Sequence, residues 1–172
     1  MTAQEAYDAV SGRGLNDLQT VLSICERLGG YCVIGDLAVN TYVRPVYTMD
    51  ADLVIAADKL AAVRAELIAA GFTVHEEEWS MNAQHPTSEL RIQFSKDLRY
   101  QSFIAPAVPA KVLGCDARVA ALPDLVAGKV LAWSAPKRRL SKRKKDEADL
   151  IRLAEEYPEV RALLPETLRR QL

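Results

Sequence analysis

The sequence predicts an α+β fold, in which a mixed sheet is flanked by helices and followed by a helical C-terminal part. Short apolar runs at residues 31–34 and 53–55 are typical of buried strands, and residues 89–94 alternate between polar and apolar side chains. Apolar side chains recur at three- and four-residue spacing over residues 15–25 and 60–68, which predicts amphipathic helices between those strands.

Length and composition favour one globular domain. The chain has 172 residues, of which 49% are hydrophobic and 26% charged, so it can bury a core of ordinary size. We expect a single domain over residues 1–172, with a sheet-containing core at about 15–115 and a helical part at 116–172.

Charge and hydropathy exclude several classes of protein. The net charge of −1 argues against a protein coated all over by nucleic acid, so such contacts would need a local basic cluster. The sequence shows no secretory leader and no apolar run near membrane-spanning length, so we expect a cytoplasmic protein without a membrane partner. Three cysteines at positions 25, 32 and 115 show no metal-binding spacing and are interpreted as reduced thiols.

Two helices are expected before the first strand. Residues 1–14 are polar and contain a Ser-Gly-Arg-Gly break, which predicts a short helix. Residues 15–25 have amphipathic helical spacing, and the glycine pair at 29–30 marks the end of that helix. The next predicted elements are a strand at 31–34, a turn at Gly35 and Asp36, a helix at 37–42 and a strand at 50–55.

After this strand the pattern alternates again. Apolar spacing predicts a helix over 58–70, with Asp58 as its N-cap and Gly71 just after its end. The remaining predicted elements are a strand at 72–75, a polar loop at 76–87, strands at 89–94 and 100–104, a short edge strand at 111–114, helices at 123–134 and from 145 onward, and closing helices over 158–172.

The stretch YCVIGDLAVNTYVRPVYTMDADLVI, residues 31–55, carries the first functional signal. Asp50 and Asp52 are two apart in a strand, so both carboxylates point to one face. Two like charges this close repel each other unless one keeps its proton, and Mg²⁺ removes that conflict. The glycine turn at Gly35, followed by a helix start, allows close approach of a phosphate.

The pattern G-D-L-A-V-N…T-M-D-A-D-L resembles the first motif of the nucleotidyltransferase superfamily, in particular the small bacterial abortive-infection and toxin–antitoxin members. The resemblance implies that Asp50 and Asp52 are catalytic ligands of Mg²⁺ and that Gly35 and Thr48 contact a nucleoside triphosphate. Asp36 stands where the family has a small or hydroxylated residue, so its carboxylate would repel a triphosphate unless a cation compensates it.

The strand at 89–94 supplies two further candidates. Leu90, Ile92 and Phe94 share one face, which leaves Glu89, Arg91 and Gln93 on the other. The resemblance implies a third metal-binding carboxylate on a strand near here, and its counterpart is Gln93, whose neutral amide is a weaker ligand. Arg91, on the same face, is a candidate for nucleotide binding. Either two acids suffice, or Glu89 is brought in by another register, or the chemistry has been lost.

The last third of the sequence carries a lysine on an apolar stripe and a basic run. Lys129 falls among apolar residues of the helix at 123–134, so it either snorkels to solvent or points into the site to neutralise phosphate charge. The run PKRRLSKRKK at 136–145 is either a solvated loop or a contact for nucleotide or RNA phosphates.

Two acids follow this run. Asp146 and Asp149 lie three apart on one helical face, and K-D-x-x-D-L-x-x-L resembles later motifs of the abortive-infection nucleotidyltransferases. The resemblance implies catalytic roles for Lys129, Asp146 and Asp149, with either acid orienting the lysine or the acceptor. The alternative is that both acids pair with nearby basic residues, or lie near the start of the helix, where negative charge is favourable.

The sequence therefore supports two hypotheses. The first is a Mg²⁺-dependent nucleotidyltransferase-like enzyme that transfers a nucleotide from a nucleoside triphosphate to an RNA or protein acceptor, with toxin–antitoxin or phage defence as its setting. The second, motivated by Asp36 and Gln93, is a catalytically degenerate fold that acts as a binding or antitoxin-like partner protein.

Overall fold

A seven-stranded mixed sheet forms the centre of the computed structural model, which describes residues 2–172; Met1, where the predicted first helix and domain begin, lies outside the described residues. The strand order is β3-β4-β5-β2-β1-β7-β6. β2 pairs in parallel with β5, and β1 with β7, whereas the other neighbours are antiparallel. The strands are β1 (Tyr31–Ile34), β2 (Asp50–Ile55), β3 (Thr73–Glu76), β4 (Ser80–Gln84), β5 (Arg91–Ser95), β6 (Val108–Val112) and β7 (Cys115–Val119).

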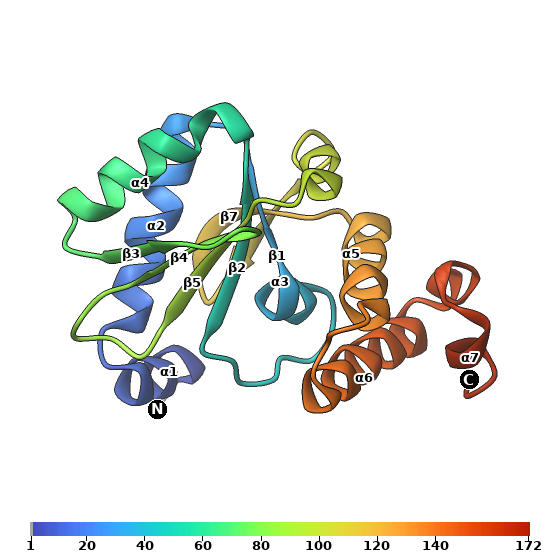
Figure 1. Cartoon of the computed structure of the whole chain (residues 1–172). Coiled ribbons are helices and arrows are strands. Elements are labelled where there is room, and N and C mark those ends of the chain that lie inside the picture. Colours follow the sequence, from blue (N-terminus) through green and yellow to red (C-terminus); the bar gives the residue numbers. More distant parts are fainter. Residues whose placement is uncertain (1) are drawn as a thin grey trace.

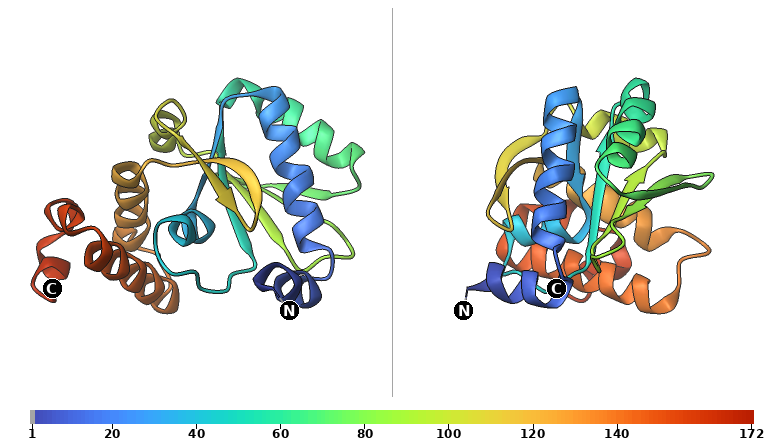
Figure 2. Two further views of the ribbon diagram at one scale, coloured as in Figure 1. Left: turned by 180° about the vertical axis from the view of Figure 1, so that it is seen from behind. Right: turned by 90° about the vertical axis from the view of Figure 1, so that its left-hand side faces the viewer.

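Helices cover both faces of this sheet, as Figure 1 shows. α2 (Gly14–Leu28) and α4 (Leu60–Ala69) pack on one face, and α3 (Gly35–Tyr42) and α5 (Leu122–Ser134) lie on the other. α6 (Leu140–Glu156), the 3₁₀ helix η3 (Pro158–Leu163) and α7 (Glu166–Arg169) extend beyond α5, away from the sheet (Figure 2). The predicted α+β fold with a C-terminal helical subregion is confirmed.

Strand β2 lies in the middle of the sheet and presents its two faces to different surroundings. Ala51 and Leu53 are fully buried, whereas Asp50 and Asp52 are only partly buried. The alternation therefore puts the two acids on the face that carries α3 and α5, and it anchors their strand by apolar contacts on the opposite face.

Three segments of the sheet region differ from the expectation, two of them throughout and one in part. The expected polar loop at 76–87 contains β4, whose Met81 and Ala83 are buried. Residues 98–103 form a 3₁₀ helix, η2 (Leu98–Phe103), capped by the Asp97 side chain, where a strand at 100–104 was expected. The edge strand expected at 111–114 is confirmed at residues 111–112, which end the edge strand β6, whereas Leu113 and Gly114, both with positive φ, form the turn of the β6–β7 hairpin.

Helix boundaries also differ from the expectation in three places. α3 begins at Gly35 itself, without a preceding turn. A 3₁₀ turn, η1 (Ala57–Lys59), precedes α4, so Asp58 is not its N-cap. α6 begins at Leu140, which makes the second half of the basic run helical. No helix within residues 2–172 is long and apolar enough to cross a bilayer.

Candidate active site

The bend between β1 and α3 is built around Gly35 and Asp52. Gly35 has φ +68°, and a β-carbon placed on it would lie 2.4 Å from Oδ2 of Asp52. Only glycine therefore permits this contact, because any side chain would be both strained and in collision with the carboxylate. The backbone at the start of α3 thus lies directly against the second acid of the D-A-D motif.

The acid pair and the predicted amide come together across two neighbouring strands. Asp50 and Asp52 share one face of β2, and both line the same cavity as Gly35. In the parallel register of β2 and β5, Asp52 lies opposite Gln93 and Asp50 lies opposite Arg91. The structure therefore places Gln93 at the position expected of a third carboxylate.

Asp50 and Asp52 differ in their charge partners. Asp50 accepts hydrogen bonds from Nε of Arg91 at 2.7 Å and from Nζ of Lys142 at 3.4 Å. Within residues 2–172 no cation forms an ion pair with Asp52. Burial, reinforced by the negative charges of Asp36 and Asp50, raises the pKa of Asp52 to about 6, although Lys129 and Lys142 act against that rise.

This donor set fits a hard divalent cation. Mg²⁺ is commonly held by one or two carboxylates and completes its shell with water and substrate phosphates. Asp50 and Asp52 would supply the carboxylates, and Gln93, which lines the same cavity, would supply an amide oxygen. In the described part of the chain no three His, Cys, Asp or Glu side chains gather at metal-binding spacing. A bound ion would therefore depend on two acids and on its substrate for the remaining ligands.

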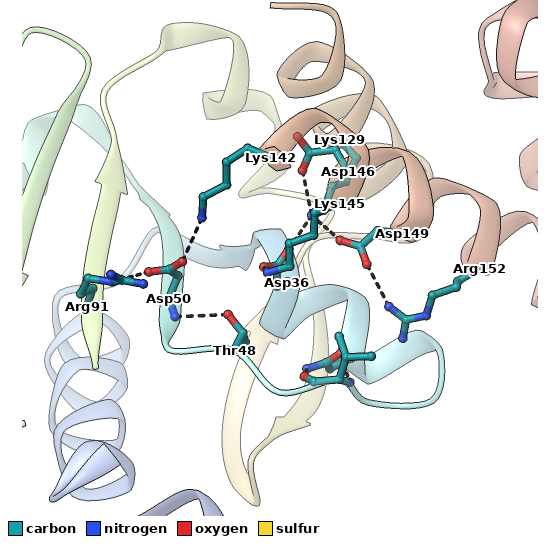
Figure 3. Close-up of polar contacts among 12 residues, drawn as sticks. Asp36, Thr48, Asp50, Arg91, Lys129, Lys142, Lys145, Asp146, Asp149 and Arg152 are labelled. Carbon is teal, nitrogen blue, oxygen red and sulfur yellow. Dashed lines mark hydrogen bonds and ion pairs between the residues drawn. The ribbon is translucent and has the colours of Figure 1, made fainter. Parts of the chain in front are cut away.

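Lys129 lies at the centre of a buried acid cluster between α3, α5 and α6 (Figure 3). Its Nζ donates to Asp36 at 2.6 Å, to Asp149 at 2.7 Å and to Asp146 at 3.3 Å. Burial would lower the pKa of the lysine, but Asp149 and Asp36 outweigh burial and raise it. Lys129 therefore neither snorkels nor stands free to meet a phosphate, because three carboxylates neutralise it in place.

Additional basic side chains complete this cluster. Asp36 also pairs with Lys145, Asp146 with Arg138 at 2.7 Å, and Asp149 with Arg152 at 2.8 Å. The two lysines that contact Asp36 outweigh the effect of its burial and hold the pKa of that carboxyl well below its usual range. The negative charge of Asp36 is thus compensated by cations of the protein, which a carboxylate near a triphosphate needs.

One cavity of about 350 Å³ unites these groups. Around the acid pair its wall is strongly charged, and further along it becomes apolar and aromatic. Eight of the ten predicted site residues line it, namely Gly35, Asp36, Asp50, Asp52, Arg91, Gln93, Lys129 and Asp146.

Two predicted residues lie outside the cavity wall. Thr48 is buried, and its hydroxyl accepts a hydrogen bond from the backbone N–H of Asp50 at 3.2 Å. It thereby supports the start of β2 without reaching the cavity. Asp149 lies behind Lys129 and meets the site only through that lysine.

Several residues of the cavity were not expected from the sequence. Arg138, Lys142 and Lys145 were expected only as members of a basic run. Helix α6 turns Lys142 and Lys145 toward the acids, and Arg138 reaches Asp146 from the segment just before that helix. The helical spacing of Lys142, Lys145, Asp146 and Asp149 was the signal that could have separated them from solvated neighbours. Tyr100 and Phe103 were expected in a strand and instead line the cavity from η2.

Comparisons with known proteins identify the fold. No protein-family model matches the sequence, and no curated protein matches it. Among solved structures, the antibiotic-resistance factor ANT(2'')-Ia superposes with a TM-score of 0.55 and 16% identity, covering 89% of this chain and 91% of its own. The lincosamide antibiotic adenylyltransferase LnuA, bound to lincomycin, gives a TM-score of 0.53 and 11% identity over 89% and 98% of the two chains.

A third similar structure is a nucleotidyltransferase-like protein from Paracoccidioides brasiliensis, with a TM-score of 0.55 and 17% identity over 84% of this chain and 77% of that one. At these identities the comparisons establish the fold alone. The chain has the fold of nucleotidyltransferases, in agreement with the superfamily that its D-A-D motif resembles.

Proposed function

We propose that this protein is a Mg²⁺-dependent nucleotidyltransferase that uses a nucleoside triphosphate as donor. The observation that carries the proposal is the contact of Asp52 with Gly35, because it puts an uncompensated carboxylate beside Asp50 and against a helix start in one cavity. Metal-holding acids and a phosphate-binding bend are the two parts that nucleotidyl transfer requires next to each other.

Each group has a role in this proposal. When bound, Mg²⁺ neutralises phosphate charge and fixes the geometry of the displacement. Asp50 and Asp52 would hold the ion, with the amide of Gln93 as a weaker neighbour. Lys142 and Arg91 flank Asp50 and would balance the polyphosphate. Lys129 acts as a positioning residue, because it ties α6 and its basic side chains to the start of α3.

A second groove supports an assignment of the acceptor side. With a volume of about 540 Å³, it shares Asp50, Arg91 and Gln93 with the first cavity and extends over β3 and β4. In the strand register, Asp52, Gln93, Asn82 and His75 form one row across four strands. After Asp52 this row consists of hydrogen-bonding side chains, whereas the basic residues of α6 line the main cavity on the other side of the acid pair.

We therefore propose a small hydroxyl-bearing acceptor in place of the RNA expected from the basic run, because an RNA backbone requires basic contacts where it lies. The solved complexes of ANT(2'')-Ia with adenylyl-2''-tobramycin and of LnuA with lincomycin, which have the same fold, are compatible with acceptors of this size. A protein acceptor and a toxin–antitoxin or phage-defence setting stay hypotheses that rest on the sequence resemblance.

Labelled nucleoside triphosphates test the transfer reaction directly. Purified protein with Mg²⁺ is expected to transfer label to hydroxylated small molecules, and D50N and D52N should each lower the rate by about 10³-fold, since metal stabilisation is worth several kcal/mol. Asp116→Asn is the matched control, because the Asp116 side chain is 88% exposed and outside the cavity. Equal transfer by wild type and D50N would contradict the proposal.

The second candidate function is nucleotide binding without catalysis. It is favoured by Gln93, which gives the metal a neutral amide where the superfamily motif implies a third carboxylate. Calorimetry separates the two functions. If the protein is an enzyme, Mg²⁺ should tighten nucleotide binding in the wild type, and D52N should lose this effect of Mg²⁺. If it only binds nucleotide, its affinity should be the same with and without Mg²⁺ and in D52N, and no label should be transferred to RNA, protein or small-molecule acceptors.

A further inference from the structure

The main cavity changes in chemical character along its length. Its charged end surrounds Asp50 at the start of β2, where Arg91 and Lys142 contact that acid. Its other end is formed by η2 and the first half of α5, which contribute Tyr100, Phe103, Leu125 and Gly128. The Gln101 side chain fastens η2 to the last residue of β2 by donating to the carbonyl of Ile55 at 3.0 Å. This contact places η2 at the C-terminal end of β2, whereas Asp50 lies at the start of that strand.

The aromatic end is preorganised. Tyr100 and Phe103 pack edge to face, with ring centroids 5.2 Å apart at 86°. A β-carbon on Gly128 would lie 3.1 Å from both rings, so the glycine lets them approach the backbone of α5. The Tyr100 hydroxyl donates to the carbonyl of Gly128 at 3.4 Å, and Asp97 caps η2. In Figure 1 this yellow-green helical turn stands beside the upper ends of β2 and α5, opposite α6.

A cavity with charge at one end and aromatic rings at the other matches one class of molecule in particular. We infer that the aromatic end, Tyr100 and Phe103, is the platform on which the base of the donor nucleotide stacks while its phosphates lie at the Gly35 bend. The inference rests on the proposed function and adds the residues that recognise the base. Because Phe103 is 5% exposed and Tyr100 is partly exposed, Tyr100 supplies the contact and Phe103 fixes its ring.

Inorganic tripolyphosphate provides the decisive comparison, because it has the phosphates of ATP without the base. Dissociation constants of ATP and tripolyphosphate, each with Mg²⁺, would be measured by calorimetry for wild type, Tyr100→Leu and Tyr100→Phe. Stacking on an aromatic ring is worth enough that Y100L should weaken ATP binding by about tenfold or more. Tripolyphosphate binding should stay within about twofold, and Y100F should behave like wild type because it keeps the ring.

Two further variants guard against a packing artefact. Gly128→Ala pushes a methyl group against both rings and should weaken ATP binding without touching the phosphate end. Trp79→Ala removes a 65%-exposed aromatic side chain outside the cavity and should leave both affinities unchanged. Thermal unfolding of each variant shows whether it is folded, and Y100L retains most of the apolar volume of the tyrosine, so that its fold is preserved.

The outcomes separate this inference from the proposed function. If wild type binds neither ATP nor tripolyphosphate, the proposed function fails and the base platform fails with it. If wild type binds both, but Y100L leaves ATP affinity unchanged or weakens both ligands equally, the proposed function stands and the base platform is overturned. Equal affinity of wild type for ATP and tripolyphosphate overturns the platform as well, because the base would then contribute nothing.

Discussion

The acid pair on β2 and the buried cluster around Lys129 contain the same kinds of side chain in opposite electrostatic states. In the cluster, Asp36, Asp146 and Asp149 each meet two cations at hydrogen-bonding distance. On β2, Asp50 meets two more exposed cations. Asp52 forms no ion pair within the described residues. Neutralised acids serve to join helices, and an acid left uncompensated beside a cavity is available for a ligand.

The pKa values of Asp36 and Asp52 are shifted in opposite directions. The two lysines at Asp36 outweigh its burial and keep the pKa of its carboxyl low, whereas burial and neighbouring acids raise the pKa of Asp52 to about 6. Asp36 therefore stabilises the fold in its charged form, and Asp52 is charged at a cost that a cation would remove. Removing a charge from either region tests this electrostatic difference.

The largest expected effect comes from the centre of the cluster. Lys129→Met leaves three buried carboxylates without their shared cation, so the free energy of unfolding should fall by about 3–5 kcal/mol. Chemical denaturation monitored by circular dichroism measures this change. Lys142→Met is the matched control, because that lysine is 44% exposed and contacts one carboxylate, so its removal should cost less than about 1 kcal/mol. Equal losses in the two variants would contradict the comparison.

An intermediate effect is expected from the pH dependence of Asp52. Its raised pKa means that the folded state binds more protons than the unfolded state between about pH 4 and 6. Without Mg²⁺, Asp52 therefore lowers stability as the pH rises through this window, by up to about 3 kcal/mol, and this loss is absent below pH 4.

Asp52→Asn isolates this contribution. The variant removes the titrating group, so at pH 7 without Mg²⁺ it should be more stable than wild type, and the difference should shrink toward pH 4. Unfolding curves across this pH range measure the difference between the two proteins. Asp36 does not titrate in this range, because its pKa is held well below it. If the two proteins show parallel pH profiles, Asp52 is not held in the uncompensated state described above.

The site divides into parts that the sequence could and could not predict. The placement of Gly35, Asp50 and Asp52 was predictable, because strand alternation and a glycine bend are local properties. Gln93 was also expected at its position, since one clear alternation fixed the faces of β5. By contrast, the neutralisation of Lys129 depends on acids 93, 17 and 20 residues away in sequence, and no local pattern fixes which helices meet.

The misassigned segments have local causes. Tyr100 and Phe103 belong to residue types that favour strands, yet the Asp97 cap and the Gln101 contact with β2 hold this segment as a 3₁₀ helix. β4 alternates Met81 and Ala83 with polar residues, which are weak strand formers, and becomes a strand by pairing with β3 and β5. The error at η2 hid the aromatic end of the main cavity, and the error at β4 hid one wall of the second groove.

The smallest expected effect on the free energy of unfolding is that of Arg91, whose charge is proposed to contact the ligand and not to stabilise the fold. Its side chain is 63% exposed and pairs with Asp50, so Arg91→Ala should change the free energy of unfolding by less than about 1 kcal/mol. If Arg91 contacts the nucleotide as proposed, the KM for the triphosphate should nevertheless rise several-fold with little change in kcat. Steady-state kinetics against Arg64→Ala, whose exposed pair with Glu76 lies outside the cavity, measure this split. An unchanged KM would exclude a nucleotide contact by Arg91 and leave only its ion pair with Asp50, because a charge that contacts the ligand must affect binding more than folding.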